Sequence, residues 1–597
     1  MANKKIILCF LCVVAICSSK WNNQERNIYD RPTNEDEYPH ICQRPCQNSE
    51  PMVCEYLFQV EWYYTMSKAC YNCPMDKEDC YRPDCVIGTG VGRPIVTVNR
   101  TIPGPLIDVC LGDKLLITVK NKMLGETTSI HWHGVHQYGT PYMDGVPFLT
   151  QCPIHSGTAF LYNFTALSPG TFFYHSHTGI QRGNGLFGSL IIRDPKDPYT
   201  RNYTHDLPMH VINLRDWYND IQEDMYLHYV HAGAHDYPSL ILVNGIGFNN
   251  FTNITNDATI ARFNVVKNNR YRFRVINGAF RDCPVEVSID NHVLEVISSD
   301  GYEIAPVVVD TLTTFSGERY DFILTTNKKR RNYWIRFRGL INCAHHQAFQ
   351  LGVLHYKGSP KDQLPKGPLP TYENSTPRKQ ILNPFNIGEE TRGPIIASEM
   401  RSLSPIEPEL LQEPDYKFYL DMDLNNVSNP AYNLYPSYGF HQVAKNMRTT
   451  TPQINNIAFE FPERPLITDP DQETCNATTM QGKNCSVDFC HCTHVIQLEL
   501  NKSVELVLID NGWTTDAGHP FHLHGMSFRV LTLRKLGTWT TKQTVIDLDN
   551  QGLIKRNFDH PPIKDTIIVP DGGYVVVRFI ANNPGKKRIR GIKNYLL

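Results

Sequence analysis

The chain has 597 residues, which is long enough for several domains, and its hydrophobic content of 41% is ample for buried cores. Its 58 basic and 60 acidic residues give a formal net charge of −2, so no net field attracts nucleic acid or an anionic membrane surface. These numbers favour a multidomain globular protein and are compatible with small neutral substrates.

Residues 1–19 are predicted to be a secretory signal peptide. Lys4 and Lys5 precede the apolar run from Ile6 to Ile16, and Cys17-Ser18-Ser19 supplies the small-residue ending. The alternative is a buried N-terminal strand, but Asn, Gln, Glu and Arg fill the stretch that follows. The run is too short for a stable membrane span, and no later segment is long and apolar enough. We therefore expect a secreted, extracellular protein without a membrane span.

Sequons and cysteines agree with export. Of the 18 cysteines, three lie in the predicted signal peptide and 15 remain, so at least one thiol must lack an intramolecular partner. Some of the ten Asn-x-Ser/Thr sequons would be glycosylated in an exported chain. They begin at Asn99, Asn163, Asn202, Asn250, Asn253, Asn374, Asn426, Asn476, Asn484 and Asn501.

Residues 20–89 are predicted to form a Cys-rich extension. Seven cysteines lie between Cys42 and Cys85, which in a secreted chain indicates a module held together by disulfides. Cys70-x-x-Cys73 leaves a metal site as the alternative, although no second Cys-x-x-Cys with zinc-finger spacing follows.

Three strand-rich blocks follow, at residues 90–195, 205–357 and 415–585, with a linker predicted at 358–414. Short runs of β-branched and aromatic residues broken by Gly, Pro and Asn are typical of β-sandwiches and barrels. In the middle block, Arg270–Asn277 alternates Arg with Tyr, Phe and Val. An RNA-binding face is one interpretation of this alternation. A half-buried strand with one solvated side is the simpler one.

Three histidine motifs carry the chemistry. They are His131-Trp132-His133-Gly134, His175-Ser176-His177 and His519-Pro520-Phe521-His522-Leu523-His524-Gly525. Residues two apart in a strand project from one face, so each His-x-His pair directs two imidazoles at one point. Imidazole binds copper, zinc, iron and nickel, so the ligand type alone leaves the metal open.

The order and surroundings of these motifs resemble the multicopper oxidases, and within them the insect-type laccases. Met143-Asp144-Gly145-Val146-Pro147, Pro169–Tyr174, Gly185–Gly188 and Phe558–Thr566 are similar to family text, and the resemblance covers roughly residues 90–585. It implies an all-β fold of three cupredoxin-like Greek-key β-sandwich domains after a Cys-rich extension. It also implies copper, with a metal cluster between the first and third domains and a middle domain that holds them in register.

The resemblance further implies a role for each histidine. His131 and His522 would bind the type 2 copper. Four residues would supply part of the binuclear type 3 pair, and these are His133, His175, His177 and His524. His519 would bind the separate type 1 copper, which collects single electrons. Asp144 matches a position where a carboxylate orients bound water and relays protons, and a structural Asp-Gly turn is the alternative.

The end of the chain departs from the family pattern. After Val575–Gly585 the family continues into His-Cys-His, whereas Lys586–Leu597 contains neither His nor Cys. We therefore expect the third domain to be incomplete, its last strand to be missing, and the type 1 Cys ligand to be absent. Residues 586–597 are predicted to be a basic tail that is foreign to the family. Cys490-His491-Cys492 contains the right residue types, but a disulfide-bearing loop is the better interpretation of it.

The sequence thus predicts a laccase-like oxidase that oxidises small diphenols in one-electron steps and reduces dioxygen to water. Ferroxidase or ascorbate oxidase activity of the same fold is the alternative enzyme. A truncated, non-catalytic isoform without the type 1 copper is the alternative of a different class. The oligomeric state is left open.

Overall fold

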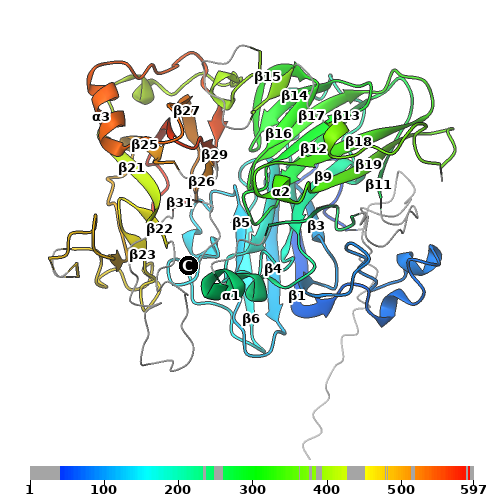
Figure 1. Ribbon diagram of the computed structural model, residues 1–597, viewed down its shortest axis with the longest axis horizontal. Helices are drawn as coiled ribbons and strands as arrows, with labels where there is room; N and C mark the ends of the chain where they lie inside the picture. Colours follow the sequence, from blue (N-terminus) through cyan, green and yellow to red (C-terminus); the bar gives the residue numbers. More distant parts are fainter. Residues whose placement is uncertain are drawn as a thin grey trace, which may run out of the picture.

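The computed structural model describes residues 40–232, 237–247, 260–361, 363–375, 380–384, 393–425, 451–476, 479–480, 482–512, 518–585 and 589–591. The predicted signal peptide lies outside these residues. Figure 1 shows three β-rich bodies, the first blue to cyan, the second green and the third yellow to red. The predicted all-β architecture of three sandwich domains is confirmed.

The first domain consists of two four-stranded sheets, with strand orders β2-β1-β4-β6 and β3-β8-β7-β5. The first sheet contains β1 (Val53–Tyr64), β2 (Pro94–Val98), β4 (Lys114–Asn121) and β6 (Ala159–Thr165). The second contains β3 (Gly104–Cys110), β5 (Ile130–His133), β7 (Gly170–Ser176) and β8 (Phe187–Arg193). Because β1 pairs in parallel with β4, the Cys-rich extension contributes a strand to this domain.

Disulfides fasten the extension to the domain. All seven of its cysteines are oxidised, in the pairs Cys42–Cys54, Cys46–Cys110, Cys70–Cys85 and Cys73–Cys80. The disulfide prediction is confirmed, and the alternative of a metal site at Cys70 and Cys73 is wrong. Cys110 ends β3, so the pair with Cys46 crosslinks the extension to the second sheet.

The second domain consists of two six-stranded sheets, β10-β9-β12-β17-β14-β15 and β11-β19-β18-β13-β16-β20. The first contains β9 (Val211–Trp217), β10 (Leu240–Val243), β12 (Arg270–Asn277), β14 (Leu294–Ser299), β15 (Tyr302–Val309) and β17 (Arg319–Thr325). The second contains β11 (Ala261–Val265), β13 (Val285–Ile289), β16 (Thr311–Thr314), β18 (Asn332–Gly339), β19 (Phe349–Tyr356) and β20 (Ile381–Leu382). The strand β20 belongs to the predicted linker, which therefore packs against this domain.

Strand β12 corrects one prediction. Two of its three arginines are not solvated, because Arg272 is only 4% exposed and Arg274 only 3% exposed. Arg272 is paired with Asp197 and Asp321, while Arg274 is paired with Asp206 and Asp321. The alternation of Arg with apolar residues thus marks a buried ionic layer between domains.

The third domain has a six-stranded sheet, β22-β21-β25-β30-β27-β28, facing a smaller one, β29-β26-β31. The larger sheet contains β21 (Tyr416–Asn425), β22 (Thr451–Ile454), β25 (Ser503–Asp510), β27 (Phe528–Lys535), β28 (Ile563–Lys564) and β30 (Gly573–Ile580). The smaller contains β26 (His519–Leu523), β29 (Thr566–Val569) and β31 (Ile589–Gly591). A short pair of strands, β23 (Ala458–Phe459) and β24 (His491–Cys492), lies beside it.

The predicted loss of the last strand is wrong for this edge. Strand β31, in the tail that follows Gly585, pairs antiparallel with β26 at Phe521, His522 and Leu523. Both edges of the histidine-bearing strand are therefore covered, since β29 pairs with its other side.

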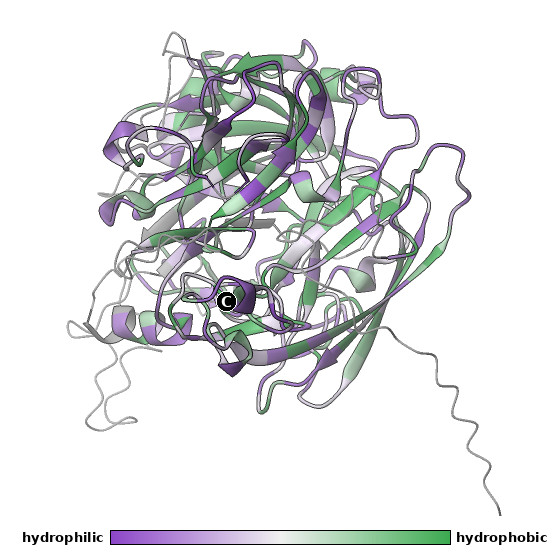
Figure 2. Cartoon of the chain, turned by 90° about the vertical axis from the view of Figure 1, so that its right-hand side faces the viewer, coloured by the Kyte–Doolittle hydropathy of each residue, from purple (hydrophilic) through white to green (hydrophobic). Residues whose placement is uncertain are grey.

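Helices are few among the described residues. They are α1 (Gln222–Ala232), α2 (Asn342–His345) and α3 (Lys542–Asn550), with short 3-10 turns such as Lys68–Cys70 and Pro141–Met143. None of the helices in the described part of the chain is long and apolar enough to cross a membrane. Figure 2 shows apolar residues running along the strands and polar ones gathering in the loops.

Two large cores hold the domains. One fills the first domain around Trp132, and the other continues from the second domain into the third. Apolar burial of this extent is the main stabilising term in a protein of this size. The continuous second core fixes the third domain relative to the second.

Candidate metal centre

Strand β5 places the residues of the first histidine motif on its two opposite faces. Trp132 is fully buried, and its ring lies 5.2 Å from that of Tyr162 and 5.3 Å from that of Phe164. Because side chains alternate along a strand, the anchored indole forces His131 and His133 to project from the opposite face. Their ring centroids lie 5.7 Å apart.

Strand β7 brings the second motif to the same place. Its antiparallel register sets His175 opposite His131, with ring centroids 5.4 Å apart. His177, just beyond the strand, has its ring 5.6 Å from that of His131. The Nδ1 atom of His175 donates to the carbonyl of Ser176 at 2.8 Å, while its Nε2 is buried without a hydrogen-bond partner among the described residues.

Strand β26 divides the third motif between two faces. Phe521 and Leu523 are buried in the apolar core, so the alternating His522 must project from the other face. Its ring stacks on that of His133 with centroids 3.7 Å apart. His524 follows and lies 3.9 Å from His131 by the same measure.

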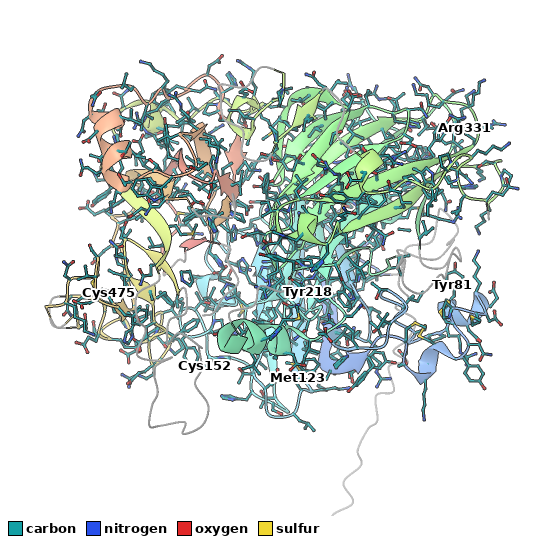
Figure 3. The ribbon with its side chains drawn as sticks, viewed as in Figure 1. Tyr81, Met123, Cys152, Tyr218, Arg331 and Cys475 are labelled. Atoms are coloured by element: carbon teal, nitrogen blue, oxygen red, sulfur yellow. A yellow bond between two sulfur atoms is a disulfide. The ribbon has the colours of Figure 1, made fainter. Side chains whose placement is uncertain are left out.

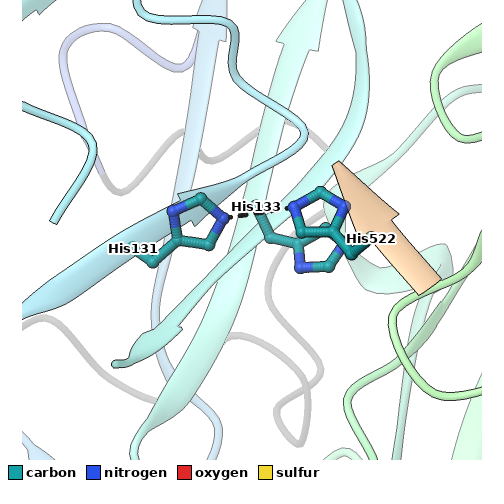
Figure 4. Close-up of side chains that lie close together, drawn as sticks. All are labelled: His131, His133 and His522. Carbon is teal, nitrogen blue, oxygen red and sulfur yellow. Dashed lines mark hydrogen bonds between the residues drawn. The ribbon is translucent and has the colours of Figure 1, made fainter. Parts of the chain in front are cut away.

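The first and third domains therefore meet in a cluster of six buried histidines. They are His131, His133, His175, His177, His522 and His524. Figure 4 shows His131 and His522 facing one another across the domain boundary beside His133, with their Nε2 atoms 3.4 Å apart. Two imidazole nitrogens at that separation can bind one metal ion at the usual distance of about 2.0 Å. The unpartnered Nε2 of His175 is a further donor suited to a metal.

Asp144 lies where the sequence predicted a functional carboxylate. It is 1% exposed, and its Oδ2 accepts a hydrogen bond from Nδ1 of His524 at 3.0 Å. Its backbone carbonyl accepts one from Nδ1 of His131 at 2.8 Å. Both imidazoles are thereby oriented with Nε2 toward the cluster, as is common for metal-ligating histidines.

Asp565 and Thr566 form a second polar support that the sequence interpretation did not single out. The carbonyl of Asp565 accepts a hydrogen bond from Nδ1 of His522 at 2.9 Å, and Thr566 Oγ1 lies 2.9 Å from Nε2 of His133. The carboxylate of Asp565 lies 3.4 Å from His522 and 3.5 Å from His133. The sequence signal that could have indicated these residues is the stretch Phe558–Thr566, which is similar to family text and ends in the polar residues Lys564-Asp565-Thr566.

Burial disfavours the charged form of four imidazoles in the cluster. Desolvation is the largest cause that lowers the pKa of His133, His175, His522 and His524. Neutral imidazole is the form that binds metal. Burial alone raises the pKa of Asp144, but the neighbouring His524 and His131 outweigh it and hold the pKa well below its usual value. The site thus combines imidazole donors with a buried carboxylate.

His519 lies apart from the six. It starts β26 on the face opposite His522, since the two are an odd number of residues apart. Its Nδ1 forms a hydrogen bond with Asp510 at the end of β25, and its Nε2 is buried without a hydrogen-bond partner among the described residues. The structure therefore separates His519 from the cluster, as the sequence interpretation expected for a ligand of another metal.

The remaining cysteines follow the disulfide interpretation. Cys490 pairs with Cys485 and Cys492 with Cys475, so Cys490-His491-Cys492 is a disulfide-bearing loop. Among the described residues, Cys152 alone is a free thiol, and it is exposed. This accounts for the odd count outside the first 39 residues. Figure 3 marks Cys152 in the first domain and Cys475 in the third.

Comparisons with known proteins give one consistent answer. Family models described as multicopper oxidase match residues 81–197, 209–359 and 461–590. Laccase-2 of Pleurotus ostreatus is 31% identical over 505 residues, covering 82% of this chain and 78% of that protein. Laccase-2 of Trametes versicolor is 30% identical over 519 residues, covering 83% of each.

Solved structures share the fold. The crystal structure of Fet3p, described as a multicopper oxidase that functions in iron import, has a TM-score of 0.67 at 24% identity and covers 91% of this chain and 88% of its own. The laccase from Botrytis aclada has a TM-score of 0.65 at 25% identity and covers 91% of this chain and 86% of its own. The three cupredoxin-like domains thus have close structural counterparts.

Proposed function

The chain belongs to the multicopper oxidase family as a laccase-like oxidoreductase, and we propose that it oxidises diphenols in one-electron steps and reduces dioxygen to water. The observation that carries this proposal is the cluster of six buried histidines between the first and third domains. Such a donor set suits several copper ions held close together. Bound copper would store the electrons that dioxygen needs for its four-electron reduction.

We assign the ligands from the resemblance and the geometry together. His131 and His522 would share the type 2 copper, because their Nε2 atoms converge at 3.4 Å. The other four cluster histidines would contribute to the type 3 pair. They are His133, His175, His177 and His524.

The polar residues around the cluster orient donors and hold protons. The carboxylate of Asp144 fixes His524 through its Nδ1, and the carbonyl of the same residue fixes His131. Because this buried carboxylate lies directly beside the imidazoles of the cluster, we propose that it orients water bound nearby and accepts a proton from it. We propose that Asp144 is the catalytic carboxylate.

The separate type 1 site has one supporting residue in this structure, His519. The resemblance places a Cys ligand after Gly585, and residues 586–597 contain no Cys. We propose that His519 is one ligand of this type 1 site. A blue-copper site needs that Cys beside two His.

The test is to load the polypeptide 1–597 with copper and record its visible spectrum and its oxygen uptake with a diphenol. Bound copper together with oxygen uptake that depends on the diphenol is the expected result. Bound copper without any oxygen uptake that depends on the diphenol would contradict the proposed diphenol oxidation. A wild-type chain that takes up no copper would contradict the proposed function itself.

Iron oxidation is the second candidate, because Fet3p shares the fold and its description refers to iron import. Measuring oxygen uptake with Fe(II) and with ascorbate beside the diphenol separates the candidates. Faster uptake with either than with any diphenol would replace the laccase assignment.

We also propose that the protein is secreted and glycosylated. The predicted signal peptide, the disulfides and several exposed sequons support this. The exposed sequon residues include Asn202, Asn374, Asn476, Asn484 and Asn501. Mass spectrometry of protein recovered from the medium of expressing eukaryotic cells, before and after glycan removal, tests both points.

A further inference from the structure

We infer that Arg319, in the middle domain, is the positioning residue that sets the geometry of the histidine cluster from outside it. The inference rests on the proposed copper centre. It adds a residue that does not bind the metal itself. Arg319 begins β17 and is 0% exposed. It reaches the cluster through Asp565, and it touches all three domains.

Every donor of its guanidinium is used. Nε donates to the carbonyl of Thr171 in the first domain at 3.0 Å. Within the second domain, Nη1 donates to the carbonyl of Gly317 at 2.9 Å and Nη2 to that of Asp300 at 3.1 Å. The two remaining hydrogens form a bidentate bond to Asp565 in the third domain, with Nη1 2.7 Å from Oδ1. Arginine has five N–H donors, so the fork is fully satisfied.

The bond to Asp565 bears directly on the metal ligands. Asp565 holds His522 through its carbonyl, and its carboxylate accepts from Oγ1 of Thr566 at 2.8 Å. That same Oγ1 lies 2.9 Å from Nε2 of His133. The imidazoles that stack at 3.7 Å therefore share one polar support, and Arg319 fixes that support.

A second carboxylate of the middle domain completes the clamp. Asp300 accepts from the backbone N–H of Arg319 at 3.0 Å, and its Oδ2 accepts from the backbone N–H of Thr566 at 3.1 Å. The buried ammonium of Lys564 lies 3.2 Å from the same Oδ2. Side chain and backbone of the turn from β28 to β29 are thus both held by the middle domain.

Close packing leaves the guanidinium no room to move. Gly134, next to His133, has φ +92°, and a Cβ placed there would lie 2.5 Å from Nη2 of Arg319. The same Cβ would meet Phe172 at 2.6 Å and the carboxylate of Asp565 at 2.9 Å. The glycine of the first histidine motif is therefore required for the approach of an arginine from another domain.

The middle domain has no His-x-His motif, yet through Arg319 it positions the residues that orient the metal ligands. Outer-sphere partners of metal ligands change metal affinity by about 10- to 100-fold when they are replaced. Lysine offers three donors from a single point and cannot reproduce the planar fork. Arg319→Lys should therefore retain the charge and lose the positioning.

The experiment titrates Cu(II) into the metal-free proteins in competition with a chromophoric chelator, beside thermal unfolding of the same samples. Arg319→Lys and Arg319→Gln are compared with Arg578→Lys. Arg578 is a matched control, because it is also buried and bonded to Glu505 of the third domain and to the carbonyls of Leu410 and Gln412 at the end of the linker. The expected result is about a 10- to 100-fold weaker Cu(II) affinity for the Arg319 variants and an unchanged affinity for the control.

The Cu(II) affinities of the Arg319 variants support or overturn the inference in every case. If an Arg319 variant unfolds at a lower temperature but binds Cu(II) as tightly as wild type, Arg319 is only structural and the inference is overturned. If Arg319→Gln does not fold, the comparison of Arg319→Lys with Arg578→Lys still decides. A wild-type chain that binds no Cu(II) would overturn the proposed function and this inference together, whereas equal binding by all variants would overturn the inference alone.

Discussion

The Nε2 atoms of His131 and His522 lie 3.4 Å apart, although 391 positions separate the two residues in the chain. One belongs to the first domain and the other to the third. A metal bound between them would crosslink the two domains. Copper uptake and domain association are therefore linked, and ligand binding to the folded state raises stability by mass action.

Strand β26 supplies a matched pair of variants for the cluster. We expect His522→Ala to lose copper from the cluster, because it removes the nitrogen that faces His131. His519→Ala, on the opposite face of the same strand, should leave the cluster copper in place. Metal analysis of the two purified variants checks this. Equal copper content in both would contradict the division of the strand into two faces.

The carboxylate of Asp144 is expected to strengthen Cu(II) binding by the cluster. In Asp144→Asn an amide replaces the charged acceptor of His524, so Cu(II) affinity should fall by about 10- to 100-fold. Chelator competition measures the affinity. Asp559→Asn is a suitable control, because its partner Arg401 lies on the surface and the side chain of Asp559 is 68% exposed. An affinity for Asp144→Asn equal to that of the control would leave Asp144 as a turn residue.

The ionic layer between the first two domains predicts a pH dependence. Burial raises the pKa of Asp206, but Arg193 and Arg274 outweigh it and lower the pKa far below its ordinary value of 3.8. Because the folded-state pKa is depressed, this group stabilises the folded protein above about pH 4, and its contribution is lost as the pH falls. Asp206→Asn should cost about 2 kcal/mol at pH 7.

Thermal unfolding of wild type and Asp206→Asn across pH 3 to 7 checks the sign. The difference in melting temperature should be largest near pH 7 and shrink below about pH 4. The exposed Asp224→Asn, on α1, should show little difference at any pH. A gap that widens toward low pH would refute the assignment.

The cysteine inventory predicts one thiol. In protein lacking residues 1–39, Cys152 is the free cysteine and the other fourteen form seven disulfides. Thiol titration of the denatured, unreduced protein should therefore give one equivalent per chain, and none after Cys152→Ser. Three equivalents would mean that one of the seven pairs is reduced.

The sequence was sufficient for the fold class and for the six histidines of the cluster. Period-two spacing determines which imidazoles share a face, and Trp132 and Phe521 determine which face is buried in the core. The spacing within each motif does not show that the first and third domains meet. The order of the three motifs, through the family resemblance, predicted that contact.

Other features depended on tertiary contacts. The alternating arginines of β12 have the pattern of a half-solvated strand, yet Asp206 and Asp321 from elsewhere in the chain neutralise them in a buried layer. Arg319 has no motif of its own, because its partners Thr171 and Asp565 come from two other domains. The pairing of β31 with β26 likewise depends on backbone hydrogen bonds, which residue types do not specify.

The most direct measurement is anomalous X-ray diffraction at the copper absorption edge, on crystals of the copper-loaded protein. Copper is expected among the six histidines, with one peak between Nε2 of His131 and Nε2 of His522. Peaks confined to surface histidines, or no peak inside the cluster of a fully loaded sample, would contradict the assignment of a copper centre between the first and third domains.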